Sequence, residues 1–381
     1  MLRNFLPVRV TGLLIAGAAA LSGSGGHSGP SCWQSVPGPA IPASDSGSLT
    51  AVSMPGPASG WAVGFTLPSS PGANFHPLVA RWNGRSWLTK RLPRGINGAG
   101  RLDGIAALSA SNAWAVGTSM RTNSFAPLII HWNGQQWARV RAAPVPGYIA
   151  TELLGVAAVS PNDAWAVGEA ENTANQIRTV TEHWNGSTWT LVPSPSVGKL
   201  SVLSGVAITS NHQAWAVGGW FGSTTRPLVL RWTGHAWQRA ATPRGSNAYL
   251  DSVAAVSPAQ VLAVGDVATD SNLRQAYALR WNGRAWRSIP VPAGPAGDER
   301  KLVSVTVLRG GHLAAVGDTQ GPVTTGALYA QLNARRLAVA AGPLNGTSLS
   351  AITTDGGALW AVGSKDQAAG RFVPLVQTCR Q

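Results

Sequence analysis

Ala164-Trp165-Ala166-Val167-Gly168 is one of seven copies of a short phrase that decides the fold of this chain. The other copies close on glycines at the equivalent place, Gly64, Gly117, Gly218, Gly265, Gly317 and Gly363. Successive closing glycines are separated by 53, 51, 50, 47, 52 and 46 residues. A nearly fixed period over almost all of the 381 residues indicates one repeat domain rather than several unrelated ones.

Each repeat is predicted to contain four antiparallel strands, as the third repeat shows. Residues 154–160 form a short apolar run, and residues 164–168 alternate large and small side chains. Further strands are expected at 179–184 and 189–192. Asn185-Gly186 lies between them and is typical of a tight hairpin in which both turn residues adopt positive φ.

Four antiparallel strands in a unit of this length are typical of a blade of a β-propeller. The sequence therefore predicts an all-β fold, a seven-bladed β-propeller of four-stranded antiparallel blades. We expect the tryptophans of one blade to lie over the alanines of the next and to fill the wedge between the two sheets.

The two ends of the chain are expected to share one blade. The last repeat stops after its third strand, Pro374 to Cys379, and the missing fourth strand is supplied by Trp33 to Pro39, which matches residues 189–195 in outline. Cys32 and Cys379 are the two cysteines of the chain, and both lie at this junction. Adjacent strand ends bring Cα atoms within disulfide reach, so we predict a Cys32–Cys379 bond in an oxidising compartment.

The N-terminal 31 residues are predicted to be a targeting segment followed by a spacer. Arg3 and Arg9 precede an apolar run at 10–21, as in a signal peptide of residues 1–22, and residues 23–31 are rich in glycine and serine. A lipid anchor on Cys32 is the competing interpretation, but the residues before it fit the usual motif poorly. The propeller is expected over residues 32–381, exported and secreted as a monomer with no transmembrane segment.

The formal net charge of +14 favours acidic proteins, polyanions or anionic polymers of the cell envelope as partners. Basic residues are scattered singly along the chain, which does not indicate specific binding of nucleic acid. The alternative is that the charge only keeps an exported protein soluble.

The order of parts in a repeat resembles that of kelch β-propellers and of tryptophan-rich secreted bacterial proteins. The parts are Trp165-Ala166-Val167-Gly168, Trp184, Trp189 and Pro193, and the resemblance covers residues 32–379. It departs from kelch at the double glycine, which here occurs only as Gly218-Gly219. The resemblance implies a binding scaffold and carries no particular reaction, because propellers host many functions.

Binding residues are expected on the loops between second and third strands, which differ from blade to blade. Five of these loops carry an arginine that could form a ring for a carboxylate, sulfate or phosphate polymer, namely Arg121, Arg178, Arg226, Arg274 and Arg371. The alternative is ordinary solvated charge.

Two further groups are candidates on the same loops. Trp220 and Phe221 could stack on a sugar or an apolar patch, or simply pack locally. Glu169, Asp266 and Asp318 follow the repeated glycine in three blades and could converge as a cation or sugar site.

Catalytic motifs are missing from the sequence. Histidines lack metal-ligand spacing, and His131 and His183 are expected to face solvent. There is no Gly-x-Ser-x-Gly elbow, and both cysteines are assigned to the disulfide. We therefore predict no catalytic residue, metal or cofactor, and an exported module that binds a protein or an envelope polymer. The alternatives are a lectin-like propeller and a polysaccharide hydrolase or lyase.

Overall fold

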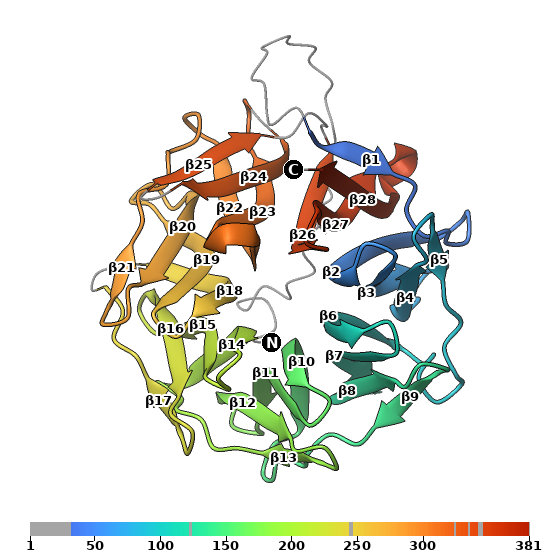
Figure 1. The fold of residues 1–381 in the computed structure, drawn as a ribbon, viewed down its shortest axis with the longest axis horizontal. Coiled ribbons are helices and arrows are strands. Elements are labelled where there is room, and N and C mark those ends of the chain that lie inside the picture. Colours follow the sequence, from blue (N-terminus) through green and yellow to red (C-terminus); the bar gives the residue numbers. More distant parts are fainter. Residues whose placement is uncertain are drawn as a thin grey trace.

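A computed structural model describes residues 32–121, 124–243, 247–323, 325–333, 336–341 and 346–380. These residues form a ring of seven blades, each of four antiparallel strands, so the predicted fold class is confirmed (Figure 1). One parallel pair, Ile177 with Leu200, joins the third and fourth blades into a single eight-stranded sheet. The described residues contain two short 3-10 helices, η1 (Arg309–Gly311) and η2 (Ala368–Gly370), and no α-helix. The predicted signal peptide and spacer lie outside the described residues.

The first strand of each blade lies closest to the axis of the ring: β2 (Ser46–Gly56), β6 (Gly100–Ser109), β10 (Ala150–Ser160), β14 (Leu200–Ile208), β18 (Ala248–Ser257), β22 (Glu299–Val307) and β26 (Thr347–Thr354). The second strands carry the repeated phrase: β3 (Ser59–Leu67), β7 (Asn112–Met120), β11 (Asp163–Glu171), β15 (Ala214–Phe221), β19 (Gln260–Ala268), β23 (Leu313–Gln320) and β27 (Ala358–Asp366).

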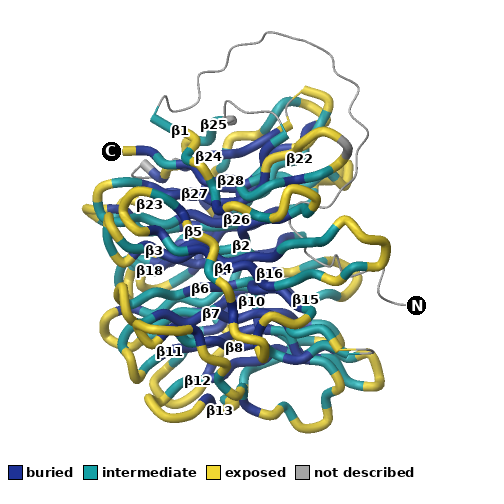
Figure 2. The backbone as a smooth tube through the Cα atoms, turned by 90° about the vertical axis from the view of Figure 1, so that its right-hand side faces the viewer, coloured by how far each residue is buried: buried dark blue, intermediate teal, exposed yellow. Residues whose placement is uncertain are grey.

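The third strands follow outward: β4 (His76–Trp82), β8 (Phe125–Trp132), β12 (Ile177–Trp184), β16 (Thr225–Trp232), β20 (Arg274–Trp281), β24 (Gly326–Asn333) and β28 (Phe372–Arg380). The fourth strands form the outer edges: β5 (Trp87–Thr89), β9 (Trp137–Val140), β13 (Trp189–Leu191), β17 (Trp237–Arg239), β21 (Trp286–Ser288), β25 (Arg336–Ala341) and β1 (Gln34–Val36). Figure 2 shows the ring from the side, with buried strand centres and exposed loops.

The repeated glycine is required by a bulge in the innermost strand. In the third blade the pairing register shifts between Leu153 and Gly155, and all seven innermost strands have a shift at the equivalent place. A Cβ built on Gly168 would lie 1.9 Å from the carbonyl oxygen of Glu152. The other six glycines face the equivalent oxygen at 1.9 to 2.2 Å, so no side chain fits at any of the seven positions.

Five of the seven seams between blades are filled by tryptophan, as predicted. Trp61 of the first blade shares a buried cluster with Ala113 and Ala115 of the second. Its ring also meets both hairpin tryptophans of that blade, with centroids 4.9 Å from Trp132 and 5.0 Å from Trp137. Four more seams repeat this triad, centred on Trp114, Trp165, Trp215 and Trp360.

The Asn-Gly hairpins form, but the predicted turn geometry is wrong. Trp184 pairs with Trp189, which leaves a four-residue loop in which Gly186 alone has a positive φ, of 94°. The side chain of Asn185 accepts hydrogen bonds from the backbone N–H groups of Ser187 and Thr188, both at 3.0 Å. Asparagine is therefore selected here as an acceptor for the turn rather than for a left-handed backbone.

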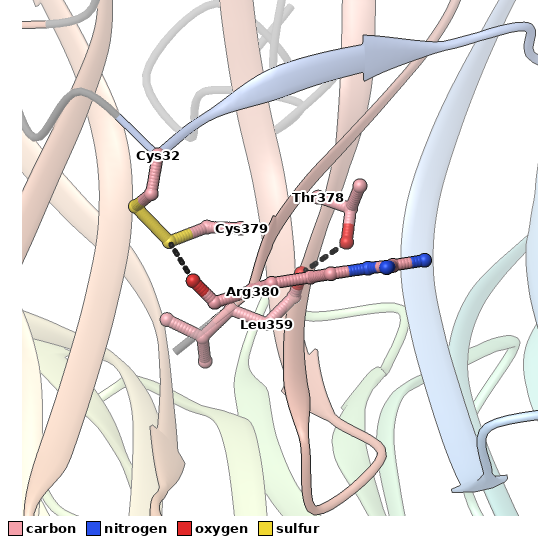
Figure 3. Close-up of a disulfide and its surroundings, with 5 residues drawn as sticks. All are labelled: Cys32, Leu359, Thr378, Cys379 and Arg380. Carbon is pink, nitrogen blue, oxygen red and sulfur yellow. Dashed lines mark hydrogen bonds between the residues drawn. A yellow bond between two sulfur atoms is a disulfide. The ribbon is translucent and has the colours of Figure 1, made fainter.

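The ring closes as predicted, because β1 completes the last blade (Figure 1). Gln34 pairs with Thr378 and Val36 with Val376. A disulfide joins Cys32 to Cys379 with their Cα atoms 4.9 Å apart, next to this strand pair (Figure 3). Thr378 donates a hydrogen bond to the carbonyl oxygen of Leu359 at 3.0 Å, which fastens the same corner to β27.

Candidate functional site

The blades differ most on the face that carries the connections between blades and the loops between second and third strands, here called the loop face. Past each repeated glycine, the first and second strands stay paired for two or three more positions before they separate. In each blade, the first of these cross-strand pairs lies directly beyond the glycine. We call these seven pairs the loop-face pairs: Ser48–Phe65, Arg101–Thr118, Glu152–Glu169, Val202–Gly219, Tyr249–Asp266, Lys301–Asp318 and Ser348–Ser364.

A polar network joins the second and third blades at this level. The guanidinium of Arg101, a residue that is 7% exposed, lies 2.9 Å from a carboxylate oxygen of Asp103 and 3.3 Å from one of Glu152. The hydroxyl of Thr118 donates to the same Glu152 oxygen at 3.2 Å. Two loop-face pairs are thus held together by charge-assisted hydrogen bonds, which fixes the side chains of this part of the rim.

Glu169 lies opposite Glu152 on the neighbouring strand and has an unusual acidity. Burial, together with the negative charges of Glu152 and Glu171, raises the pKa of its carboxyl group to about 8, although Arg101 acts in the opposite direction. Near neutral pH, Glu169 is therefore a proton donor next to a second carboxyl group.

A separate ion pair lies in the fifth blade. Asp266 is 2% exposed, pairs in register with Tyr249, and accepts a hydrogen bond from the guanidinium of Arg274 at 2.7 Å. Asp318 pairs in register with Lys301 in the sixth blade. Among the described residues, no group of three or more possible metal ligands exists, so the structure does not bring Glu169, Asp266 and Asp318 together as a cation site. Their part in a sugar site stays a prediction.

The strands extend further than predicted, which moves most candidate residues out of the loops. Strand β11 continues to Glu171 and β12 begins at Ile177, so Glu169 and Arg178 lie on strands. The same holds for Asp266, Asp318, Arg226 and Arg274. Of the five arginines, Arg121 and Arg371 are outside strands.

Four of the five arginines have partners within the chain. Arg178 donates to the carbonyl oxygen of Gly198 at 3.1 Å, and Arg371 donates to that of Ala43. Arg226 stacks on Trp220, with its guanidinium carbon 5.8 Å from the ring centroid, and Arg274 bonds Asp266. Arg121 is exposed at the end of β7. Four of the five arginines are therefore held by contacts within the chain. Binding of a ligand by any of the five stays a prediction.

Trp220 and Phe221 do not form an exposed pair on a loop, so that part of the prediction is wrong. Both lie on β15 and are partly buried. Trp220 packs against the buried cluster that contains Trp165 and Trp237, and Phe221 has its ring 5.8 Å from that of Tyr249.

His131 and His183 are partly exposed, and each also covers a tryptophan, which the sequence did not predict. The ring of His131 is 4.2 Å from that of Trp114, and that of His183 is 4.5 Å from Trp165. Arginines occupy the equivalent place in other blades: the guanidinium carbon of Arg81 lies 5.5 Å from the centroid of Trp61. A planar or cationic group at this strand position therefore caps the seam tryptophan from outside.

Sequence reasoning missed the innermost-strand members of the loop-face pairs, Arg101, Glu152, Tyr249 and Lys301 among them. They precede the leucine at which each bulge begins, as in Arg101-Leu102 and Glu152-Leu153. That leucine recurs in all seven repeats and could have marked the position.

No protein-family model matches the chain, and no curated protein matches its sequence. Solved structures do match. The solved structures it resembles are β-propellers. One is described as YCF48 bound to D1 peptide, at 13% identity and a TM-score of 0.55, over 92% of this chain and 96% of that one.

Two further similar structures cover nearly as much of this chain. A GH74 xyloglucanase from Xanthomonas campestris matches at 17% identity and a TM-score of 0.56, over 90% of this chain and 55% of that one. A protein of unknown function from Dyadobacter fermentans matches at 12% identity and a TM-score of 0.54, over 89% and 96%. Identities this low show a common fold, and the finer resemblance to kelch stays a prediction.

Among the described residues, no helix is long and apolar enough to cross a membrane.

Proposed function

We propose that this chain is an exported, non-catalytic binding module that holds a macromolecule, a protein or an envelope polymer, over its loop face. In this proposal residues 1–22 direct export, residues 23–31 are a spacer, and the propeller begins at Cys32. The Cys32–Cys379 disulfide supports export, because structural disulfides persist in oxidising compartments.

The observation that carries the proposal is the contrast between the repeated parts of the blades and the loop-face pairs. Glycine, bulge and hairpin recur around the ring, whereas the loop-face pairs are chemically different in nearly every blade. A rigid scaffold with a varied rim is typical of a surface that recognises an irregular macromolecule. The net charge of +14 favours an acidic one. One structure with the same fold is described as bound to a peptide, which supports a peptide segment as one such ligand.

The proposal is tested by presenting the purified chain with arrays of peptides, glycans and anionic polymers at low and at physiological salt. A specific ligand should remain bound at physiological salt and should lose affinity in Lys301→Ala. Arg284→Ala is the matched control, because it removes the same charge from an exposed hairpin on the opposite face. Equal losses in both variants would reduce the interaction to general charge attraction.

Hydrolysis of a polysaccharide is a second candidate, favoured by Glu152 and Glu169. The two carboxyl groups lie on directly paired residues, and the pKa of about 8 keeps Glu169 protonated at neutral pH, as a general acid requires. One similar structure is a xyloglucanase. Release of reducing sugar from xyloglucan or another polysaccharide, abolished in Glu169→Gln, would support this candidate. If the unaltered chain releases no sugar and Glu169→Gln still binds the ligand, hydrolysis is rejected and the proposal of a binding module stands.

A further inference from the structure

The seam between the sixth and seventh blades lacks the second-strand tryptophan that fills most other seams, although Trp33 and Tyr329 meet across it. Five blades place a tryptophan on the second strand, where it reaches the hairpin of the next blade. The fifth blade has Leu262 instead, and leucines of the sixth blade, Leu332 and Leu337, share its cluster. The sixth blade has Ala314, which is far smaller than either.

The neighbours of Ala314 correspond one by one to those of Trp61. Register places Gln331 opposite Ala314, as Arg81 is opposite Trp61 and stacks on its ring. Trp33 and Cys379 of the last blade stand where Trp137 and Trp132 meet Trp61. The strand positions that surround an indole at the other seams are therefore present here, with Cys379 in place of one tryptophan and Gln331 in place of the arginine, and the indole itself is missing.

Neighbouring side chains compensate for this in part. Leu359 occupies the position equivalent to that of Ala113, which lies beside Trp61. The ring of Trp33 packs against that of Tyr329, with centroids 4.5 Å apart. A cavity of about 110 Å³ remains, lined by Ala314, Tyr329, Gln331, Ile352, Leu359 and Trp33 among others. This cavity opens to solvent and is lined mostly by apolar side chains, with Tyr329 and Gln331 as its polar members. An enclosed apolar cavity of about 150 Å³ binds benzene, so apolar space on this scale suits a small aromatic ring.

We propose that this cavity is a binding site for one small planar aromatic molecule of the size of indole. The ligand takes the place of the missing seam tryptophan. Its flat ring packs between blades six and seven against alanine, leucine and isoleucine side chains, and Gln331 lies where other blades put the group that covers the ring. The site is at the outer seam and is separate from the loop-face pairs.

The test is titration of the full chain with 5-fluoroindole, followed by fluorine NMR and by the thermal midpoint of unfolding. We expect saturable binding of one equivalent and a midpoint that rises with ligand concentration. Ala314→Trp should abolish the saturable binding, because it supplies the ring from the chain itself. If that variant does not fold, Ala314→Leu fills part of the same space and should weaken binding.

A second variant checks the logic at another seam. Trp61→Ala creates the same vacancy between the first two blades, and it should bind one additional equivalent of 5-fluoroindole and regain thermal stability with it. Binding that is unchanged in both Ala314 variants would overturn the proposal, since the ligand would lie elsewhere. Absence of binding to the unaltered chain, while Trp61→Ala binds one equivalent, would also overturn it.

Discussion

Single residues in this propeller are constrained most strongly at the repeated glycines, where the innermost strand comes against the second strand. Gly168→Ala should lower the free energy of unfolding by roughly 2–3 kcal/mol, because the new Cβ would overlap the carbonyl oxygen of Glu152 and the backbone would have to shift. Denaturant unfolding measures the loss. Gly95→Ala is the control: it has open space around it and should change stability by less than about 0.5 kcal/mol. Equal losses at Gly168 and Gly95 would contradict the steric account.

Glu182 gives a prediction about pH at the same scale. It is fully buried on β12, with one carboxyl oxygen accepting from the backbone N–H of Ala143 at 2.9 Å, and burial raises its pKa to about 7. The folded state thus binds the proton more tightly than the unfolded state, whose glutamates have a pKa of about 4.3. This group therefore destabilises the fold increasingly as pH rises from about 4 to 7, and above that range the cost levels off at no more than roughly 3–4 kcal/mol.

Glu182→Gln removes the charge and keeps an acceptor for Ala143. We expect the variant to be more stable than the unaltered chain at pH 8, with a smaller gain at pH 5, when both are unfolded in urea. A stability difference that is the same at the two pH values would show that Glu182 does not titrate in this range.

Strands and hairpins were predictable where local sequence controls them. The tryptophans and Asn-Gly pairs placed the outer strands correctly, since they act within a few residues. The fourth strand missing from the last repeat and the two cysteines at the chain ends placed the ring closure. Strand ends on the loop face were placed too early, because pairing beyond Gly168 depends on Glu152 and Thr151, which the local sequence of β11 does not indicate. The bulge was missed for the same reason. Consequently the candidate site was assigned to loops, whereas its best-connected members lie on innermost strands.

The hairpin turn gives a prediction at the scale of one element. Asn185→Ala removes the acceptor for two backbone N–H groups and should cost roughly 1–2 kcal/mol. Asn185→Thr should cost less, because Thr233 in the next blade accepts from the N–H of Ala236 with its hydroxyl, at 3.2 Å. Unfolding of the three proteins in urea ranks them. A threonine variant as unstable as the alanine variant would show that the side-chain acceptor is not what stabilises this turn.

For the whole molecule, stability depends on how the ring is closed. The first and last strands share three paired residues, which is a short seam for a chain whose ends are otherwise far apart in sequence. The disulfide joins residues that are 347 positions apart in sequence. A loop of that length restricts the unfolded chain, which raises the free energy of unfolding by at most roughly 5–6 kcal/mol. The covalent bond is therefore expected to contribute more to closure than the strand pairing next to it.

Cys32→Ser tests this contribution. We expect a lower thermal midpoint than that of the unaltered chain in oxidising buffer, because the opened ring has a more disordered unfolded state. Reductant should lower the midpoint of the unaltered chain to that of the variant and should leave the variant unchanged, which makes the variant its own control for other effects of the reductant. Equal midpoints for the two proteins in oxidising buffer would mean that β1, its pairing with β28 and the contact of Trp33 with Tyr329 close the ring without the bond.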